Sequence, residues 1–181
     1  MDYSLGDEED EQNEYADLAE NLEEPEFSQK DAILFVVDAR KAMCEPGANG
    51  SPSPLAQAIG CVQASMQRRV QVGDADLVGL LLFGTKQQKA AAGALEFPHT
   101  YVQQELEQPT GRAMRDLQAL KTADSEYTCG HMEADDELPF ENVLWVISMI
   151  FNADSRAKTC RRRVGSASPA PRPPLAPPPS L

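Results

Sequence analysis

The sequence predicts an α/β domain with a mainly parallel sheet and flanking helices, and three features lead to that prediction. Residues 32–38 and 77–83 are continuous runs that are rich in branched apolar side chains. Such runs, without polar alternation, are typical of strands that are covered on both faces. A helical stripe of apolar residues lies between them, so the chain follows a β-loop-α-β order, which forms a right-handed crossover between parallel strands.

The first strand is followed by a loop and then by the crossover helix. Residues 45–53 are predicted to be a loop because they hold two glycines, two prolines and an asparagine. Ser53 and Pro54 begin the helix, since serine accepts a hydrogen bond from an unpaired N–H and proline fits the first helical position. Gly73 ends it. The apolar stripe recurs every three or four residues: Leu55, Ile59, Val62, Met66 and Val70.

Beyond the second strand the pattern weakens, and four further elements are predicted. They are a short edge strand at 101–102, a helix at 112–121, an acidic loop at 124–138 and a helix at 140–151. The last segment could be a strand by its β-propensity. Its length and the helical spacing of its apolar residues favour a largely buried helix instead.

The two ends of the chain are predicted to be disordered, for different reasons. Residues 1–26 form an acidic head with few apolar side chains, which could discourage contacts with DNA phosphates. Residues 155–181 begin with the basic cluster 161–163, which would suit a nuclear import signal, and continue as Pro-rich sequence with almost nothing to bury. The folded part is therefore expected at 27–154.

The charge of the chain excludes one way of binding nucleic acid. The formal net charge is −13 over 181 residues, and much of it lies in residues 7–26. Affinity for DNA rests on Lys and Arg side chains that displace counterions from phosphates. This chain therefore cannot hold DNA by bulk electrostatics, and if it serves a DNA-binding protein, other parts of that protein hold the DNA.

No segment is expected to enter a membrane or a secretory compartment. The N-terminus lacks a basic stretch followed by an apolar one, and no apolar run approaches the about 20 residues that span a bilayer. The four cysteines form no CxxC pair, which fits reduced thiols in the cytosol or nucleus. Cys129 and His131 lack two further ligands at a suitable spacing, so no metal is predicted there.

Asp38 stands where an open α/β sheet would place a ligand-binding or catalytic group, at the carboxyl end of the first parallel strand. Magnesium-binding A-type domains carry Asp-x-Ser-x-Ser at this turn, but Arg40 and Ala42 occupy the hydroxyl positions. An aspartyl-phosphate phosphatase needs a second Asp where Arg40 stands, and a P-loop needs a first glycine that residues 83–86 lack. We expect Asp38 to cap the turn and to pair with Arg40 or Lys41. No catalytic, cofactor-binding or metal-binding residue is predicted.

Four segments stand out together. They are residues 30–43 (Lys-Asp-Ala-Ile-Leu-Phe-Val-Val-Asp-Ala-Arg-Lys-Ala-Met), 83–85 (Phe-Gly-Thr), 101–109 (Tyr-Val-Gln-Gln-Glu-Leu-Glu-Gln-Pro) and 143–146 (Val-Leu-Trp-Val). In order and spacing they resemble the N-terminal part of the smaller (seventy-kilodalton) subunit of Ku, the DNA-end-binding heterodimer. The resemblance covers about residues 27–153, together with the general acidity of the head.

The resemblance implies a partial von Willebrand A-type (Rossmann-like) domain from one subunit of a heterodimer. With the larger Ku subunit, the family encircles broken DNA ends in the nucleus and recruits end-joining factors for double-strand break repair by non-homologous end joining. The DNA-encircling β-barrel lies downstream of this domain in the family. We therefore expect this chain to be a protein-interaction module that meets DNA ends only through the full-length complex, without a cofactor.

Two activities that are credited to the family are not carried over to these residues. The family is described as an ATP-dependent DNA helicase subunit, but nothing in this sequence resembles a nucleotide site. Its abasic-site lyase activity uses a Schiff-base lysine shortly before the first strand, and the matching position here is Glu26, whose carboxylate cannot form an imine. Lys30 is near, but nothing in the sequence indicates that it is buried enough to act as the nucleophile.

The C-terminal end departs from the family pattern. An A-type domain continues after the helix at 140–151 with a buried strand beside the first one, but here the basic cluster 161–163 and then Pro-rich sequence follow. We expect the strand at 32–38 to keep one open edge. An exposed edge invites pairing with other chains, and with domain stabilities of only about 5–15 kcal/mol the isolated chain is expected to be partly unfolded.

Two other classes of function stay open at this point. The chain could be a stand-alone A-type adhesion or interaction domain with a degenerate metal site, which magnesium-dependent thermal stabilisation would support. It could also be a largely disordered acidic regulator whose central region shares Ku sequence, which poor dispersion of the proton NMR spectrum would support.

Overall fold

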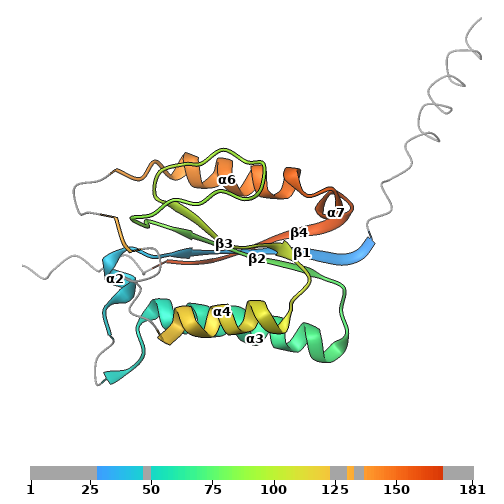
Figure 1. Cartoon of the computed structure of the whole chain (residues 1–181), viewed down its shortest axis with the longest axis horizontal. Coiled ribbons are helices and arrows are strands. Elements are labelled where there is room, and N and C mark those ends of the chain that lie inside the picture. Colours follow the sequence, from blue (N-terminus) through green and yellow to red (C-terminus); the bar gives the residue numbers. More distant parts are fainter. Residues whose placement is uncertain (1–27, 47–49, 123–129, 133–136, 169–181) are drawn as a thin grey trace, which may run out of the picture.

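The computed structural model describes residues 28–46, 50–122, 130–132 and 137–168, which form a sheet with helices on both faces (Figure 1). The elements along the chain are β1 (Ser28–Asp38), α2 (Lys41–Cys44), α3 (Pro54–Val72), β2 (Leu77–Phe83), β3 (Thr100–Glu107), α4 (Gly111–Thr122), α6 (Phe140–Ala153), α7 (Ser155–Lys158) and β4 (Cys160–Ala167).

The sheet has the strand order β3-β2-β1-β4. β1 lies parallel to both β2 and β4, whereas β3 pairs antiparallel with β2. The register aligns Asp38, the last residue of β1, with Phe83 at the end of β2. This arrangement confirms the predicted α/β fold with a mainly parallel sheet and flanking helices.

Each face of the sheet is covered by a pair of helices (Figure 1). α6 and α7 cover one face, where Leu34 of β1 packs in a cluster with Ile150 of α6. α3 and α4 cover the other, where Val37 of β1 packs in a cluster with Ile59 of α3. Because β1 and β2 lie between two cores, both of their faces need apolar side chains, which explains the runs without alternation.

The crossover helix α3 begins and ends as predicted. Ser53 Oγ accepts a hydrogen bond from the backbone N–H of Ala56 at 3.2 Å, with Pro54 in the first helical position. Gly73 follows the helix with φ 77°, a left-handed conformation that glycine adopts without strain. The first four residues of the predicted stripe are buried, whereas Val70 is 48% exposed.

The edge strand β3 is longer than the two residues predicted from the sequence. It runs over Thr100–Glu107 and buries Val102 and Leu106, while the residues between them are only partly buried. An antiparallel edge strand needs apolar side chains on one face only, so the polar stretch 103–105 hid the strand from a search for apolar runs.

The structure overturns the prediction that β1 keeps an open edge and that all of residues 155–181 are disordered. β4 pairs parallel with β1, from Ser28 opposite Cys160 to Val37 opposite Ala167. The prediction judged the segment by its arginine side chains, but a strand ladder is made by backbone groups, which arginine supplies as well as an apolar residue does. Charged side chains are also usual on edge strands, because they keep other strands away. The folded part therefore runs to Ala167, beyond the expected end at 154.

Several predictions fall outside the described residues. The acidic head at 1–26, the Pro-rich residues 169–181 and most of the acidic loop at 124–138 stay predictions. The predicted helices at 112–121 and 140–151 are confirmed as α4 and α6. In the part of the chain that the structure describes, none of the helices combines the length and apolarity that crossing a bilayer requires.

Candidate functional site

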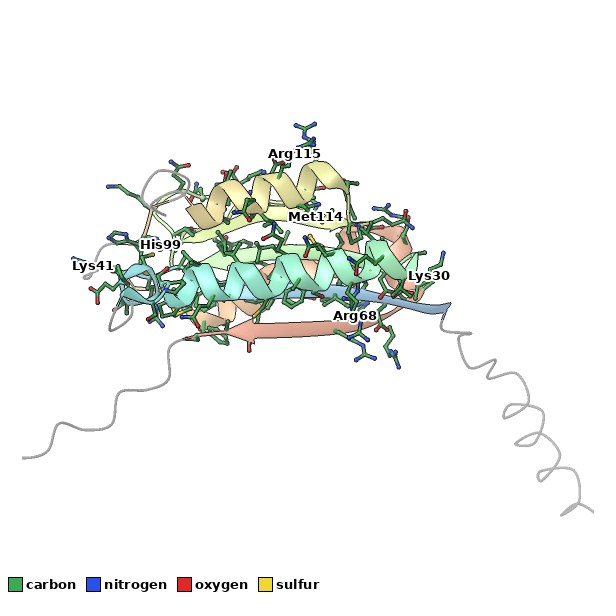
Figure 2. All side chains as sticks on the ribbon, turned by 90° about the horizontal axis from the view of Figure 1, so that it is seen from below. Lys30, Lys41, Arg68, His99, Met114 and Arg115 are labelled. Atoms are coloured by element: carbon green, nitrogen blue, oxygen red, sulfur yellow. The ribbon has the colours of Figure 1, made fainter. Side chains whose placement is uncertain are left out.

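Three chain segments meet at the carboxyl edge of the sheet, where β1, β2 and β4 end. β1 ends in Asp38, Gly84 follows β2, and Ser168 follows β4. Parallel strands bring their carboxyl ends to one edge, which is why this edge is the usual ligand-binding position in open α/β sheets. Figure 2 shows Lys41 and His99, from the loops nearby, at this end of the molecule.

The Asp38 carboxylate is fully buried, and Arg40 neutralises it. Arg40 Nη2 donates to Oδ2 at 2.6 Å, and Arg40 Nε lies 3.1 Å from Oδ1 and 3.0 Å from Oδ2. The backbone N–H of Arg40 also donates to Oδ1 at 2.9 Å, which caps the turn. The hydrogen bond to Asp38 raises the pKa of Arg40 above its usual value, so the guanidinium stays charged. The predicted role of Asp38 as a cap paired with Arg40 is confirmed.

Two further residues close the space around this ion pair. Ser168 Oγ donates to Asp38 Oδ2 at 3.1 Å, although the two residues are 130 positions apart in the sequence. Gly84 adopts φ 72°, and a Cβ atom at this position would overlap Cγ of Arg40. Glycine is therefore required here both by the backbone conformation and by the stem of the arginine.

The hydroxyl of Thr85 is also engaged. Thr85 is fully buried, and its Oγ1 donates to the carbonyl of Gln87 at 2.7 Å. Its own carbonyl lies 2.9 Å from His99 Nδ1, and the carbonyl of His99 accepts a hydrogen bond from the backbone N–H of Gly84 at 2.8 Å. These contacts hold the loop after β2 against the start of β3, so Thr85 acts as part of the loop scaffold.

The geometry of this edge suits a structural turn better than a cation site. Mg²⁺ requires nearly octahedral oxygen ligands, but both Asp38 oxygens already accept hydrogen bonds from Arg40, and Ala42 supplies no hydroxyl. A cation placed here would also face the charge of Arg40. Among the described residues, no three His, Cys, Asp or Glu side chains gather as a metal site would need. Cys129 lies outside the described residues, so the prediction for that segment stays a prediction.

A second charged cluster lies at the opposite, amino end of β1. Asp31 Oδ1 lies 2.8 Å from Arg161 Nε, and its Oδ2 lies 2.8 Å from Arg163 Nε, so two arginines of β4 share one carboxylate. The hydrogen bond from Arg161 holds the pKa of Asp31 below its usual value, against the opposing effect of burial, and the charges of Arg161 and Arg163 lower it further.

Sequence reasoning missed the partners that come from β4. Nothing local marks Ser168 as a partner of Asp38, or Arg161 and Arg163 as partners of Asp31, because each contact depends on β4 lying beside β1. The one available signal is the alternation of Arg161 and Arg163, which puts two guanidinium groups on the same face of any strand. Glu26 lies outside the described residues, and Lys30 is exposed near the start of β1 (Figure 2).

The outer surface of α6 carries exposed apolar side chains. Phe140, Leu144 and Trp145 are 55%, 55% and 60% exposed, while Val143 and Ile150 on the inner side pack into the core. Only the inner half of the predicted "largely buried" helix is therefore buried. Large exposed apolar side chains that cluster on one helix are characteristic of surfaces that meet another protein.

Proteins with similar sequences come from several different eukaryotes. The "ATP-dependent DNA helicase ku70" of Dictyostelium discoideum is 29% identical over 126 residues, covering 70% of this chain and 13% of that protein. The "X-ray repair cross-complementing protein 6" of Mus musculus is 28% identical over 145 residues, covering 78% of this chain and 23% of that protein. The "ATP-dependent DNA helicase 2 subunit 1" of Rhipicephalus appendiculatus is 30% identical over 139 residues, covering 74% of this chain and 21% of that protein.

This chain thus spans less than a quarter of the length of these three relatives. The chain also matches the model of one protein family, whose description as an alpha/beta domain fits the observed, mainly parallel sheet between helices. Residues 32–165 match it, from the buried part of β1 almost to the end of β4. The chain belongs to the family described as the Ku70/Ku80 N-terminal alpha/beta domain.

Proposed function

We propose that this chain is a protein-interaction module of double-strand break repair by non-homologous end joining. It pairs with the larger Ku subunit in the nucleus and does not itself hold DNA. Family membership supports a role in DNA repair, and several relatives are named as "subunit 1" of a helicase, which implies a second subunit in those proteins.

The observation that carries the proposal is the apolar surface of α6. Phe140, Leu144 and Trp145 leave more than half of their residue surface in water, at a cost that burial against a partner would remove. An aromatic residue flanked by apolar neighbours is the usual centre of a protein–protein contact. The carboxyl edge, in contrast, is filled by the Asp38–Arg40 pair, which leaves α6 as the surface best suited to binding.

The charge and the sequence of the chain support a proposed function that includes neither DNA binding nor nucleotide binding by this chain. A net charge of −13 opposes the approach of phosphates. The turn after β2 reads Phe83-Gly84-Thr85-Lys86, which lacks the first glycine of a P-loop. The word helicase stands in the names of proteins that are more than four times as long as the segment matched here.

A pull-down of the larger Ku subunit tests the proposal. The wild-type chain should capture it, and the double variant L144E/W145E should lose at least about tenfold in affinity, because charges would be buried at an apolar contact. The variant V70E/V72E is the matched control, since it also adds two carboxylates at exposed apolar positions, 48% and 67% exposed, on α3, which covers the opposite face of the sheet (Figure 1). Equal loss in both variants, or no capture by the wild type, would contradict the proposal.

A DNA-end assay tests the second half of the proposal. The chain alone should not bind blunt duplex ends, even at low ionic strength where electrostatic attraction is strongest. Capture of blunt ends that weakens as salt is added would show that this chain holds DNA itself.

A further inference from the structure

A groove with basic walls lies at the start of β4. Its volume is about 460 Å³, and Lys158, Cys160, Arg161 and Arg162 line it. Lysine and arginine present their aliphatic stems to such a groove while their charged ends stay in water at its rim. The groove therefore offers an apolar floor below cationic groups, which suits a peptide that carries both carboxylates and apolar side chains.

The cations of this groove exceed the carboxylates that the fold provides for them. Arg161 pairs with Asp31, but Asp31 also pairs with Arg163, so one negative charge serves two positive ones. Arg162 lies over the ring of Phe151 at 5.7 Å and contacts neutral oxygens of Ala157 and Asn152. Within the described ranges, neither Arg162 nor Lys158 forms an ion pair, so the groove keeps unbalanced positive charge.

The residues that precede β1 carry an excess of negative charge. Residues 1–27 hold 12 of the 29 Asp and Glu residues and none of the 16 Lys and Arg residues. The remaining residues carry 17 acidic against 16 basic side chains and are nearly neutral. The acidic head thus holds almost all of the net charge of −13.

The strand register places the first described residue, Ser28, at the groove. Ser28, the first residue of β1, pairs with Cys160, which lines the groove. Residues 22–27, Leu-Glu-Glu-Pro-Glu-Phe, directly precede Ser28 in the sequence and carry three carboxylates among apolar side chains. Lys30 and Arg68 lie at this same end of the molecule, opposite Lys41 (Figure 2).

We propose that the acidic head binds in this basic groove and covers it. Each exposed ion pair is weak because water and salt screen it, so the association depends on several contacts at once. The covalent connection at Ser28 supplies an effective concentration in the millimolar range or above, which makes weak contacts sufficient. The head then keeps competing polyanions away from the start of β4, and added salt releases it because the charges are exposed.

Zero-length carbodiimide crosslinking of the full chain, followed by mass spectrometry, tests this proposal. The reagent joins a carboxylate to an amine only when they are in contact, and Lys158 is the amine in the groove. Crosslinks from residues 1–27 to Lys158 should exceed those to Lys41, an exposed lysine at the opposite end of the sheet, by about fivefold or more at low ionic strength. They should fall to the level of Lys41 in high salt.

Three variants separate binding in the groove from general attraction. Arg162→Gln should lower the crosslinks to Lys158, whereas Arg162→Lys keeps the charge and should preserve them. Arg115→Gln removes a charge from the exposed side of α4, away from the groove, and should have no effect (Figure 2). Equal crosslinking of Lys158 and Lys41 in the wild type, or crosslinks to Lys158 that are as strong in Arg162→Gln as in the wild type, would overturn the proposal. Circular dichroism of each variant confirms that the sheet is intact.

Discussion

The two aspartates at the ends of β1 solve the same electrostatic problem in different ways. Asp38 is fully buried and is held by Arg40, only two residues away. Asp31 is 14% exposed and is held by Arg161 and Arg163, which come from β4 at the far end of the described chain. The first carboxylate is completely buried and its partner is close in sequence, whereas the second is slightly exposed and its partners are distant in sequence.

The contrast indicates how much each ion pair contributes to the stability of the fold. Breaking a buried pair leaves a charge without solvent or partner, which is costly, whereas an exposed pair is screened and contributes little. The carboxyl edge should therefore control the stability of the sheet, while the amino edge should respond to pH and salt. Four predictions test this division, beginning with the largest expected effect.

Arg40→Ala should destabilise the chain by about 2–4 kcal/mol, because the Asp38 carboxylate would stay buried without its counter-charge. This loss is slightly smaller than the about 3–5 kcal/mol usual for breaking a buried ion pair. The reason is that Arg40 is 48% exposed, so water can reach Asp38 once the arginine is removed. Urea unfolding followed by circular dichroism measures the change. Lys41→Ala, which alters the neighbouring exposed cation, is the control, and an equal loss in both variants would contradict the assigned role of Arg40.

Gly84→Ala should cost about 1–3 kcal/mol from its left-handed backbone alone, plus the displacement of Arg40 from Asp38. Gly93→Ala is the matched control, because Gly93 has a similar φ of 76° but nothing within 4 Å of an added Cβ. The difference between the two variants in urea unfolding measures the steric overlap with Arg40. That difference should shrink when Arg40 is also replaced by alanine, and an unchanged difference would mean that the overlap does not matter.

Asp31→Asn should have a smaller effect that depends on pH. The pKa of Asp31 is lower in the folded chain than in the unfolded one. The folded state therefore binds fewer protons than the unfolded state at pH values near these two pKa values. The stabilisation is therefore complete above the unfolded pKa of about 3.9 and is lost as the pH falls through the folded value. Between pH 5 and pH 2, the wild type should lose more stability than Asp31→Asn.

The shared carboxylate sharpens this third prediction. The double variant R161Q/R163Q should resemble Asp31→Asn in its acid dependence, whereas Arg163→Gln alone should keep part of it, because Arg161 still donates to Asp31. Added salt should reduce the effect in the wild type, since the arginine side chains are 63% and 50% exposed. Identical acid unfolding curves for the wild type and Asp31→Asn would contradict the role given to this cluster.

The same contrast explains what the sequence could predict. Asp38 and Arg40 are neighbours, so the pair and its role as a turn cap follow from the sequence, as do the apolar strands β1 and β2 and the capped helix α3. β4 could not be predicted because its residues Arg161 to Gly165 carry no apolar pattern, and its stability depends on β1 as a partner. With β4 missed, the contacts of Asp31 and Ser168 were also out of reach, since both depend on tertiary structure.

The smallest expected effect is the response to magnesium, for which we expect no change in Tm when millimolar Mg²⁺ is added to the wild type. Mg²⁺ would have to displace Arg40 from both oxygens of Asp38 and then find further oxygen ligands, which Arg40 and Ala42 do not supply. The variant R40S/A42S frees the carboxylate and adds two hydroxyls, so a magnesium-dependent rise in Tm is expected in this variant alone. A rise in the wild type would favour a stand-alone metal-dependent A-type domain over the interaction module. The magnesium response thus separates an edge that arginine has closed from one that still binds a cation, a distinction that measurements at the exposed Asp31 cluster cannot make.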